Sequence, residues 1–74
     1  MIATKEAVVE GTTVRVGDYV CFKCDIEQTG RIAGISNGVS GIVLILENIN
    51  GFQGDYIGGD TMTKQMARDC WIDG

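Results

Sequence analysis

One stretch near the start of this chain, residues 14–23 (Val-Arg-Val-Gly-Asp-Tyr-Val-Cys-Phe-Lys), constrains the fold more than any other. It predicts an extended segment, a turn at Gly17 and Asp18, and then a strand in which apolar side chains alternate with others. The sequence Gln-Thr-Gly-Arg-Ile at residues 28–32 follows closely and predicts a further turn and strand. Such a turn-strand-turn-strand opening is typical of small, strongly bent β-barrels. It indicates a fold and does not by itself name a function.

The length and composition fit one small β-rich domain. A chain of 74 residues holds a single domain with a thin core, and 45% hydrophobic residues are ample for a globular fold. Eleven glycines and no proline favour tight turns and bends in such a chain.

The net charge and the cysteine content limit the classes of binding partner and the cellular compartment that we expect. A net charge of -4, with only six scattered basic residues, disfavours non-specific nucleic-acid binding, which depends on Lys and Arg at phosphates. Three cysteines do not make the even-numbered framework of a secreted protein. The sequence has no apolar stretch long enough for a membrane span and no signal-peptide core near its start. We therefore expect no membrane association and a reducing, cytoplasmic setting.

Turn residues recur along the chain at the spacing of a small all-β sandwich or barrel. The expected strands are residues 12–16, 19–24, 31–35, 39–47 with a bend at Gly41, a short strand at 55–57 and a closing strand at 70–72. Between them the sequence predicts a polar loop at 25–30, a hairpin turn at 36–38 (Ser-Asn-Gly) and a turn at 48–51. Residues 1–10 and 61–69 are compatible with either short helical or extended structure.

The cysteine pair at Cys21 and Cys24 has the spacing of a zinc or redox site. In a strand, however, side chains alternate, so Val20, Phe22 and Cys24 would face the core while Tyr19, Cys21 and Lys23 face away. Two thiols on opposite faces cannot hold one metal. The chain has no histidine, and its loop carboxylates lack the spacing of a calcium loop. We expect free thiols, no metal, no cofactor and no catalytic residues.

The apolar run at residues 42–46 predicts self-association. Alternation sends Ile42, Leu44 and Leu46 to one face of the strand and Val43 and Ile45 to the other. Because a small barrel has a single interior, the second face needs a cover, either the N-terminal arm with Ile2, Val8 and Val9 or another subunit. We favour a closed, symmetric homo-oligomer held through Val43 and Ile45.

The glycine-rich segment at residues 51–59 carries two aromatic side chains, Phe52 and Tyr56. As a binding loop it would stack these rings on a ligand; as a structural loop it would pack them in the core. The structural interpretation is favoured, since five aromatic residues are barely enough to fill a barrel. The candidate interaction residues are Tyr19, Phe52, Tyr56, Lys23 and Arg31.

Val-Gly-Asp-Tyr-Val at residues 16–20, Gly-Arg-Ile at 30–32 and the apolar strand at 42–46 resemble the SH3-like barrels of the KOW and Tudor type. This resemblance implies a small SH3-like barrel of five to six short strands at residues 14–74, preceded by an N-terminal arm at 1–13. It also implies an association with nucleic acid. Acidic Asp25 and Glu27 stand where nucleic-acid-binding KOW motifs commonly carry a basic loop.

The chain is also similar to small uncharacterised proteins of bacteriophage and marine metagenomic origin. The similarity rests on the Gly-Asp-Tyr opening, Asp-Ile-Glu-Gln at residues 25–28, Gly-Asp-Tyr-Ile-Gly-Gly at 54–59 and Asp-Cys-Trp at 69–71. It implies no biochemical activity, and a phage-encoded protein would lie in the host cytoplasm. Together these features predict a non-catalytic binding or structural module that acts through protein–protein contacts. The alternative is a KOW- or Tudor-like module associated with nucleic acid.

Overall fold

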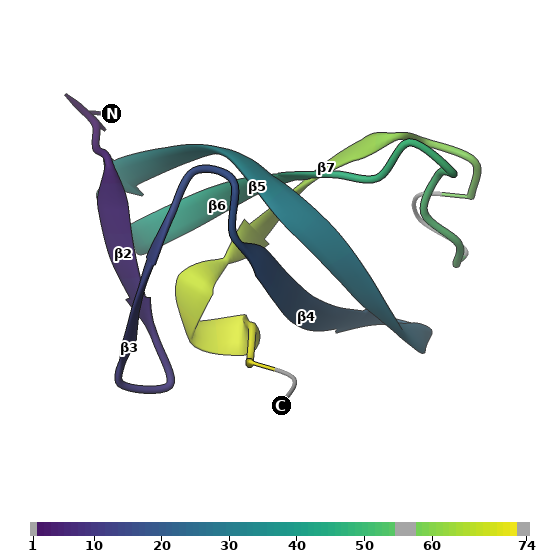
Figure 1. Ribbon diagram of the computed structural model, residues 1–74, viewed down its shortest axis with the longest axis horizontal. Helices are drawn as coiled ribbons and strands as arrows, with labels where there is room; N and C mark the ends of the chain where they lie inside the picture. Colours follow the sequence, from purple (N-terminus) through teal and green to yellow (C-terminus); the bar gives the residue numbers. More distant parts are fainter. Residues whose placement is uncertain (1, 55–57, 73–74) are drawn as a thin grey trace.

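The computed structural model describes residues 2–54 and 58–72, and it shows a small all-β domain (Figure 1). Six antiparallel strands of four or more residues and one two-residue strand form two sheets. The elements are β1 (Ile2–Ala3), β2 (Glu6–Val9), β3 (Thr12–Arg15), β4 (Tyr19–Cys24), β5 (Ile26–Gly38), β6 (Gly41–Glu47), β7 (Met62–Met66) and the 3₁₀ helix η1 (Ala67–Asp69).

The all-β class is thus confirmed. No closed barrel forms within the described residues, however, because β2 and β3 pair only with each other. The strands are also not all short, since β5 alone has 13 residues. None of the helical structure described in the chain is long enough to span a membrane.

The long strand β5 organises the larger sheet. Its first part pairs with β4 and its second part with β6, while β1 adds to its far end and β7 pairs with β6. From β7 the chain turns back through η1 (Figure 1). Trp71 then pairs with Cys21 on the edge of β4 that β5 does not occupy. Two backbone hydrogen bonds hold this pair, N–H of Cys21 to O of Trp71 at 2.8 Å and the reverse at 2.9 Å. The expected closing strand at residues 70–72 is therefore reduced to a single bridge.

Two expected connections are wrong. Most of the polar loop expected at residues 25–30 is strand, because the chain reverses at Asp25 alone, which takes a positive φ of 65°. The hairpin turn expected at residues 36–38 lies inside β5, and the reversal comes two residues later, between paired Gly38 and Gly41. Gly41 provides the positive φ of 118° there.

The reason for the displaced turn is packing. The observed register sets Ile35 opposite Leu44 and Ile32 opposite Leu46, and all four side chains are buried. A turn centred on Asn37 and Gly38 would instead pair Ile35 with polar Ser40. Burial of these apolar pairs outweighs the local preference of Asn-Gly for a turn.

The segments left open by the sequence are mainly extended. Residues 1–10 contribute β1 and β2, and residues 61–69 form β7 and η1. The hairpin of β2 and β3 turns at Glu10 and Gly11, both at positive φ, and Ala7 and Val9 join the core. The expected boundary between residues 13 and 14 falls within β3. The strand expected at residues 55–57 lies outside the described residues.

The core lies on the inner face of the larger sheet. Phe22 of β4 and Phe52 of the loop between β6 and β7 meet edge to face, with ring centroids 5.3 Å apart and an interplanar angle of 69°. Gly30 makes this packing possible, because a Cβ there would stand 2.9 Å from Cβ of Leu46 and 3.2 Å from the Phe52 ring. No buried polar or charged residue interrupts the core in the described part of the chain.

Candidate functional site

One residue from each of four neighbouring strands forms a row across the outer face of the sheet. Tyr19 of β4 pairs with Arg31 of β5, Arg31 with Glu47 of β6, and Glu47 with Met62 of β7. Their neighbours in the strands face the core, so alternation directs these four side chains to the opposite side. Paired residues on one face of a sheet contact one another, and this row therefore forms a continuous surface.

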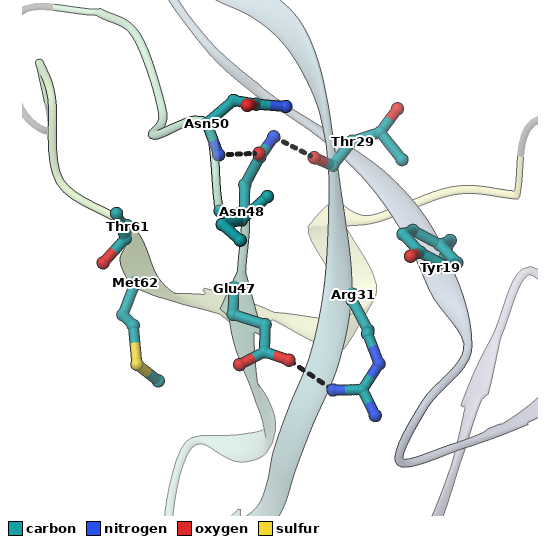
Figure 2. Close-up of a pocket in the computed structure, with 9 residues that line it drawn as sticks. Tyr19, Thr29, Arg31, Glu47, Asn48, Asn50, Thr61 and Met62 are labelled. Atoms are coloured by element: carbon teal, nitrogen blue, oxygen red, sulfur yellow. Dashed lines mark hydrogen bonds and ion pairs between the residues drawn. The ribbon is translucent and has the colours of Figure 1, made fainter.

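This row is the floor of a groove of about 650 Å³, which we call the outer-face groove. Three large apolar side chains stand exposed along it: Tyr19 is 65% exposed, Met62 50% and Ile49 94%. Figure 2 shows Tyr19 on one side of the groove and Met62 on the other. The lining residues are Tyr19, Thr29, Arg31, Glu47, Asn48, Ile49, Asn50, Thr61 and Met62.

The turn that follows β6 forms one end of the groove, and Asn48 fixes it. The Asn48 side-chain amide donates to the backbone oxygen of Thr29 at 3.3 Å, and its oxygen accepts the N–H of Asn50 at 2.9 Å. The backbone N–H of Asn48 also donates to the oxygen of Thr61 at 2.9 Å. These bonds tie the turn to β5 and to the residue before β7 (Figure 2), and Ile49 in the turn stays exposed to solvent.

Arg31 and Glu47 form an ion pair in the floor of the groove through Nη1 and Oε1 (Figure 2). Both side chains are partly exposed, and their formal charges cancel. Other basic side chains on the molecule also lie beside acids. Arg15 pairs with Glu6 at 3.0 Å, and Lys23 stands opposite Glu27 in the ladder between β4 and β5.

A second, smaller hollow of about 210 Å³ lies next to the outer-face groove, and we call it the small hollow. The two share Thr29. The small hollow is lined by Cys21, Glu27, Gln28, Thr29 and Trp71. Its lining therefore includes the single tryptophan of the chain and the exposed Glu27.

The structure brings together only part of the predicted interaction set. Tyr19 and Arg31 line the outer-face groove, whereas Lys23 is exposed on the same strand as Tyr19 but outside the groove. Phe52 is 0% exposed in the core, in line with the structural interpretation of its loop. Tyr56 lies outside the described residues.

Sequence reasoning missed Asn48, Ile49 and Met62. The first two were assigned to a turn, and Met62 lay in a segment left open between helix and strand. A signal was available at Ile49, because a large apolar residue between two asparagines of a turn has no place in a core.

The three cysteines are free thiols. Cys24 packs against the core, and Cys21 is buried outside it, so the two point to opposite faces as predicted. Burial chiefly, with the nearby Asp69 carboxylate and Cys21, raises the pKa of the Cys70 thiol to about 11. Among residues 2–54 and 58–72, no three His, Cys, Asp or Glu side chains gather as they would around a metal ion.

Val43 and Ile45, the predicted self-association residues, are half-buried on the outer face. Ile45 lies over Gly34 of β5, where an added Cβ would be 3.2 Å from its Cδ1, and Met66 of β7 is paired with Val43. Strand β7 therefore flanks these residues. Self-association stays a prediction.

No protein-family model, curated protein sequence or solved structure matches this chain. The resemblance to SH3-like barrels is consequently shown only at the level of a small all-β domain of antiparallel strands. Any indication of function therefore comes from the geometry of the outer face.

Proposed function

We propose that this protein is a non-catalytic binding module that acts through protein–protein contacts on the outer face of its larger sheet. The observation that carries the proposal is the exposure of Tyr19, Ile49 and Met62 around one groove. None of these side chains belongs to the core, which lies on the other face of the larger sheet. Tyr, Met and Arg are the residue types enriched at the centres of protein interfaces, and all three line this groove.

The groove is also suited to binding because it is built in advance. The hydrogen bonds of Asn48 hold the turn that carries Ile49, and the ion pair with Glu47 holds Arg31. A surface ordered before binding loses less conformational entropy when a partner docks. Its volume of about 650 Å³ falls in the usual range of ligand pockets, which favours a short segment of a partner over a flat surface.

The path of the chain supports an open SH3-like arrangement for this module. Strand β7 lies at one edge of the larger sheet and β4 at another, and η1 carries the chain from the first to the second. The sheet must curl for three residues of helix to make that connection.

The nucleic-acid alternative is less favoured by the charges. Arg31 is paired with Glu47, and Arg15 is paired with Glu6. Each of these two cations would have to leave or share its acidic partner to neutralise a phosphate. Catalysis is also less favoured, because Glu47 is the single carboxylate among the described residues that line the groove, and Arg31 engages it.

A random peptide-display library selected against the immobilised protein tests the proposal. We expect enriched peptides whose affinity falls about tenfold or more in Tyr19→Ala and in Met62→Ala, as at interface hot spots. Val8→Ala is the matched control, because Val8 is exposed on the β2–β3 hairpin and lines neither hollow. Failure to enrich any peptide, or equal binding by all three variants, would contradict the proposal.

A further inference from the structure

We infer that the segment bound by the outer face is an extended basic peptide, with an apolar side chain in the outer-face groove and, four residues away, a Lys or Arg in the small hollow. This inference rests on the proposed function and names the chemistry of the partner. It is carried by the adjacency of the two hollows, by their different linings and by the charge of the protein.

The two hollows follow the same strand. Arg31 of β5 lies in the row that forms the floor of the outer-face groove, and Glu27 of β5 lines the small hollow, with Thr29 common to both. All three side chains face outward, since they alternate with core-facing positions of β5. Four residues of strand cover about 13 Å, and an extended peptide has the same rise per residue. The side chains it places in the two hollows are therefore four residues apart.

The small hollow has the chemistry of a cation site. Glu27 is exposed, and no ion pair is formed between it and any residue in the described part of the chain, although Lys23 stands opposite it. Trp71 also lines this hollow, and its backbone is held by the two hydrogen bonds to Cys21. A carboxylate attracts an ammonium or guanidinium group through a charged hydrogen bond, and an indole ring attracts it through the ring face.

The outer-face groove takes the apolar side chain. Its charges are neutralised within the floor by the pair of Arg31 and Glu47, and its exposed walls are Tyr19, Ile49 and Met62. Around this neutral centre the protein carries a net charge of -4, with Asp18 and Asp60 exposed next to groove residues. Such a field attracts and orients a basic partner rather than an acidic one.

The test is an NMR titration of the ¹⁵N-labelled full chain with the peptide Gly-Ser-Leu-Ser-Gly-Ser-Arg-Ser-Gly. We expect shifts of the Trp71 indole N–H and of the Tyr19 and Thr29 amides. A peptide with Glu in place of Arg should bind about tenfold more weakly, and Glu27→Gln should weaken the arginine peptide by about the same factor. The matched control is Glu6→Gln, which removes the same charge from the β2–β3 hairpin.

Several outcomes overturn the inference. It fails if the arginine peptide does not bind at millimolar concentration, if the glutamate peptide binds equally well, or if Glu27→Gln and Glu6→Gln have the same effect. The library selection separates this failure from that of the proposed function. Enriched peptides that depend on Tyr19 but carry no basic residue, and that bind Glu27→Gln unchanged, would leave the proposed function standing and remove this inference. If no enriched peptide depends on Tyr19 for binding, the proposed function and this inference both fail.

Discussion

The inner and outer faces of the larger sheet are built by the same strands, yet they differ in how their side chains are used. On the inner face, Phe22 and Ile32 are buried among other apolar side chains, and no polar or charged residue is buried in the part of the chain that the structure describes. On the outer face, the neighbouring positions in the same strands hold an exposed tyrosine and an ion-paired arginine. The inner face meets the demands of folding, so the exposed apolar side chains of the outer face are available for another purpose.

The largest expected difference in stability is between two substitutions of aromatic residues, one on each face of the sheet. Phe52→Ala should destabilise the protein by about 3–5 kcal/mol, because it removes a ring that is fully buried against Phe22. Tyr19→Ala should change the stability by no more than about 0.5 kcal/mol, since Tyr19 is mostly exposed. Urea unfolding followed by Trp71 fluorescence measures both values. Comparable losses for the two variants would mean that the outer face also contributes to folding.

Replacing either of two glycines of β5 with alanine compares how tightly the two faces are packed, because each substitution adds a single methyl group. Gly30→Ala should cost about 1–3 kcal/mol, since the new Cβ would stand 2.9 Å from Cβ of Leu46, which cannot move away. Gly34→Ala on the outer face should cost less than about 1 kcal/mol, because its Cβ would meet the end of the Ile45 side chain at 3.2 Å, which can rotate. Thermal unfolding by circular dichroism ranks the two. The opposite ranking would show that the outer face is packed as tightly as the core.

The pH dependence of stability reports on the inner face through Cys70. Its pKa is raised to about 11 in the folded protein, mainly by burial, against about 9.0 for an exposed thiol. Between these values the unfolded chain releases a proton that the folded chain retains, so stability is complete below about pH 9 and falls as the pH rises toward 11. The loss should be on the order of 1–2 kcal/mol. Cys70→Ala should show a smaller decline in urea stability between pH 8 and pH 10.5, whereas equal declines would exclude this role.

The smallest expected effect concerns the ion pair of the outer face. Glu47→Gln should lower stability by less than about 1 kcal/mol, because both partners are partly exposed and water screens their attraction. The difference from wild type should shrink further as NaCl is raised from 50 mM to 500 mM. Urea unfolding at the two salt concentrations measures it. A larger loss that salt does not reduce would mean that the pair is structural, and that the groove floor belongs to the folding core.

The sequence predicted correctly those parts of the fold in which adjacent residues favour the same local structure. The turn at Gly17 and Asp18 forms as expected: Gly17 takes a φ of 102°, and the Asp18 carboxylate accepts the N–H of Arg15 at 2.9 Å. The strand Tyr19–Cys24 has the expected bounds and the expected core face. Of the groove, the sequence identified Tyr19 and Arg31, both of which lie on predicted strands.

The rest of the groove could not be predicted, because it depends on pairing between distant strands. Met62 reaches the row only through the pairing of β7 with β6, and a segment with no clear period does not reveal its partner. Ile49 joins the groove because Asn48 bonds to a backbone oxygen 19 residues away, on β5. The sequence offered Phe52 both as a ring that stacks on a ligand and, as the favoured interpretation, as a core side chain, and it lies in the core because Gly30 leaves room for its ring.

The sequence by itself determined the all-β class, the alternation of faces in β4 and the opposed orientation of Cys21 and Cys24, because each depends on short-range periodicity and turn chemistry. The tertiary structure decided the register of β5 with β6, since burying Ile32 and Ile35 against Leu46 and Leu44 outweighs the turn preference of Asn37 and Gly38. It also decided which side chains meet on the outer face. These side chains meet because four strands pair and bury the apolar residues of their inner side. The free energy of that burial depends on the whole sheet, so no single segment of sequence predicts it.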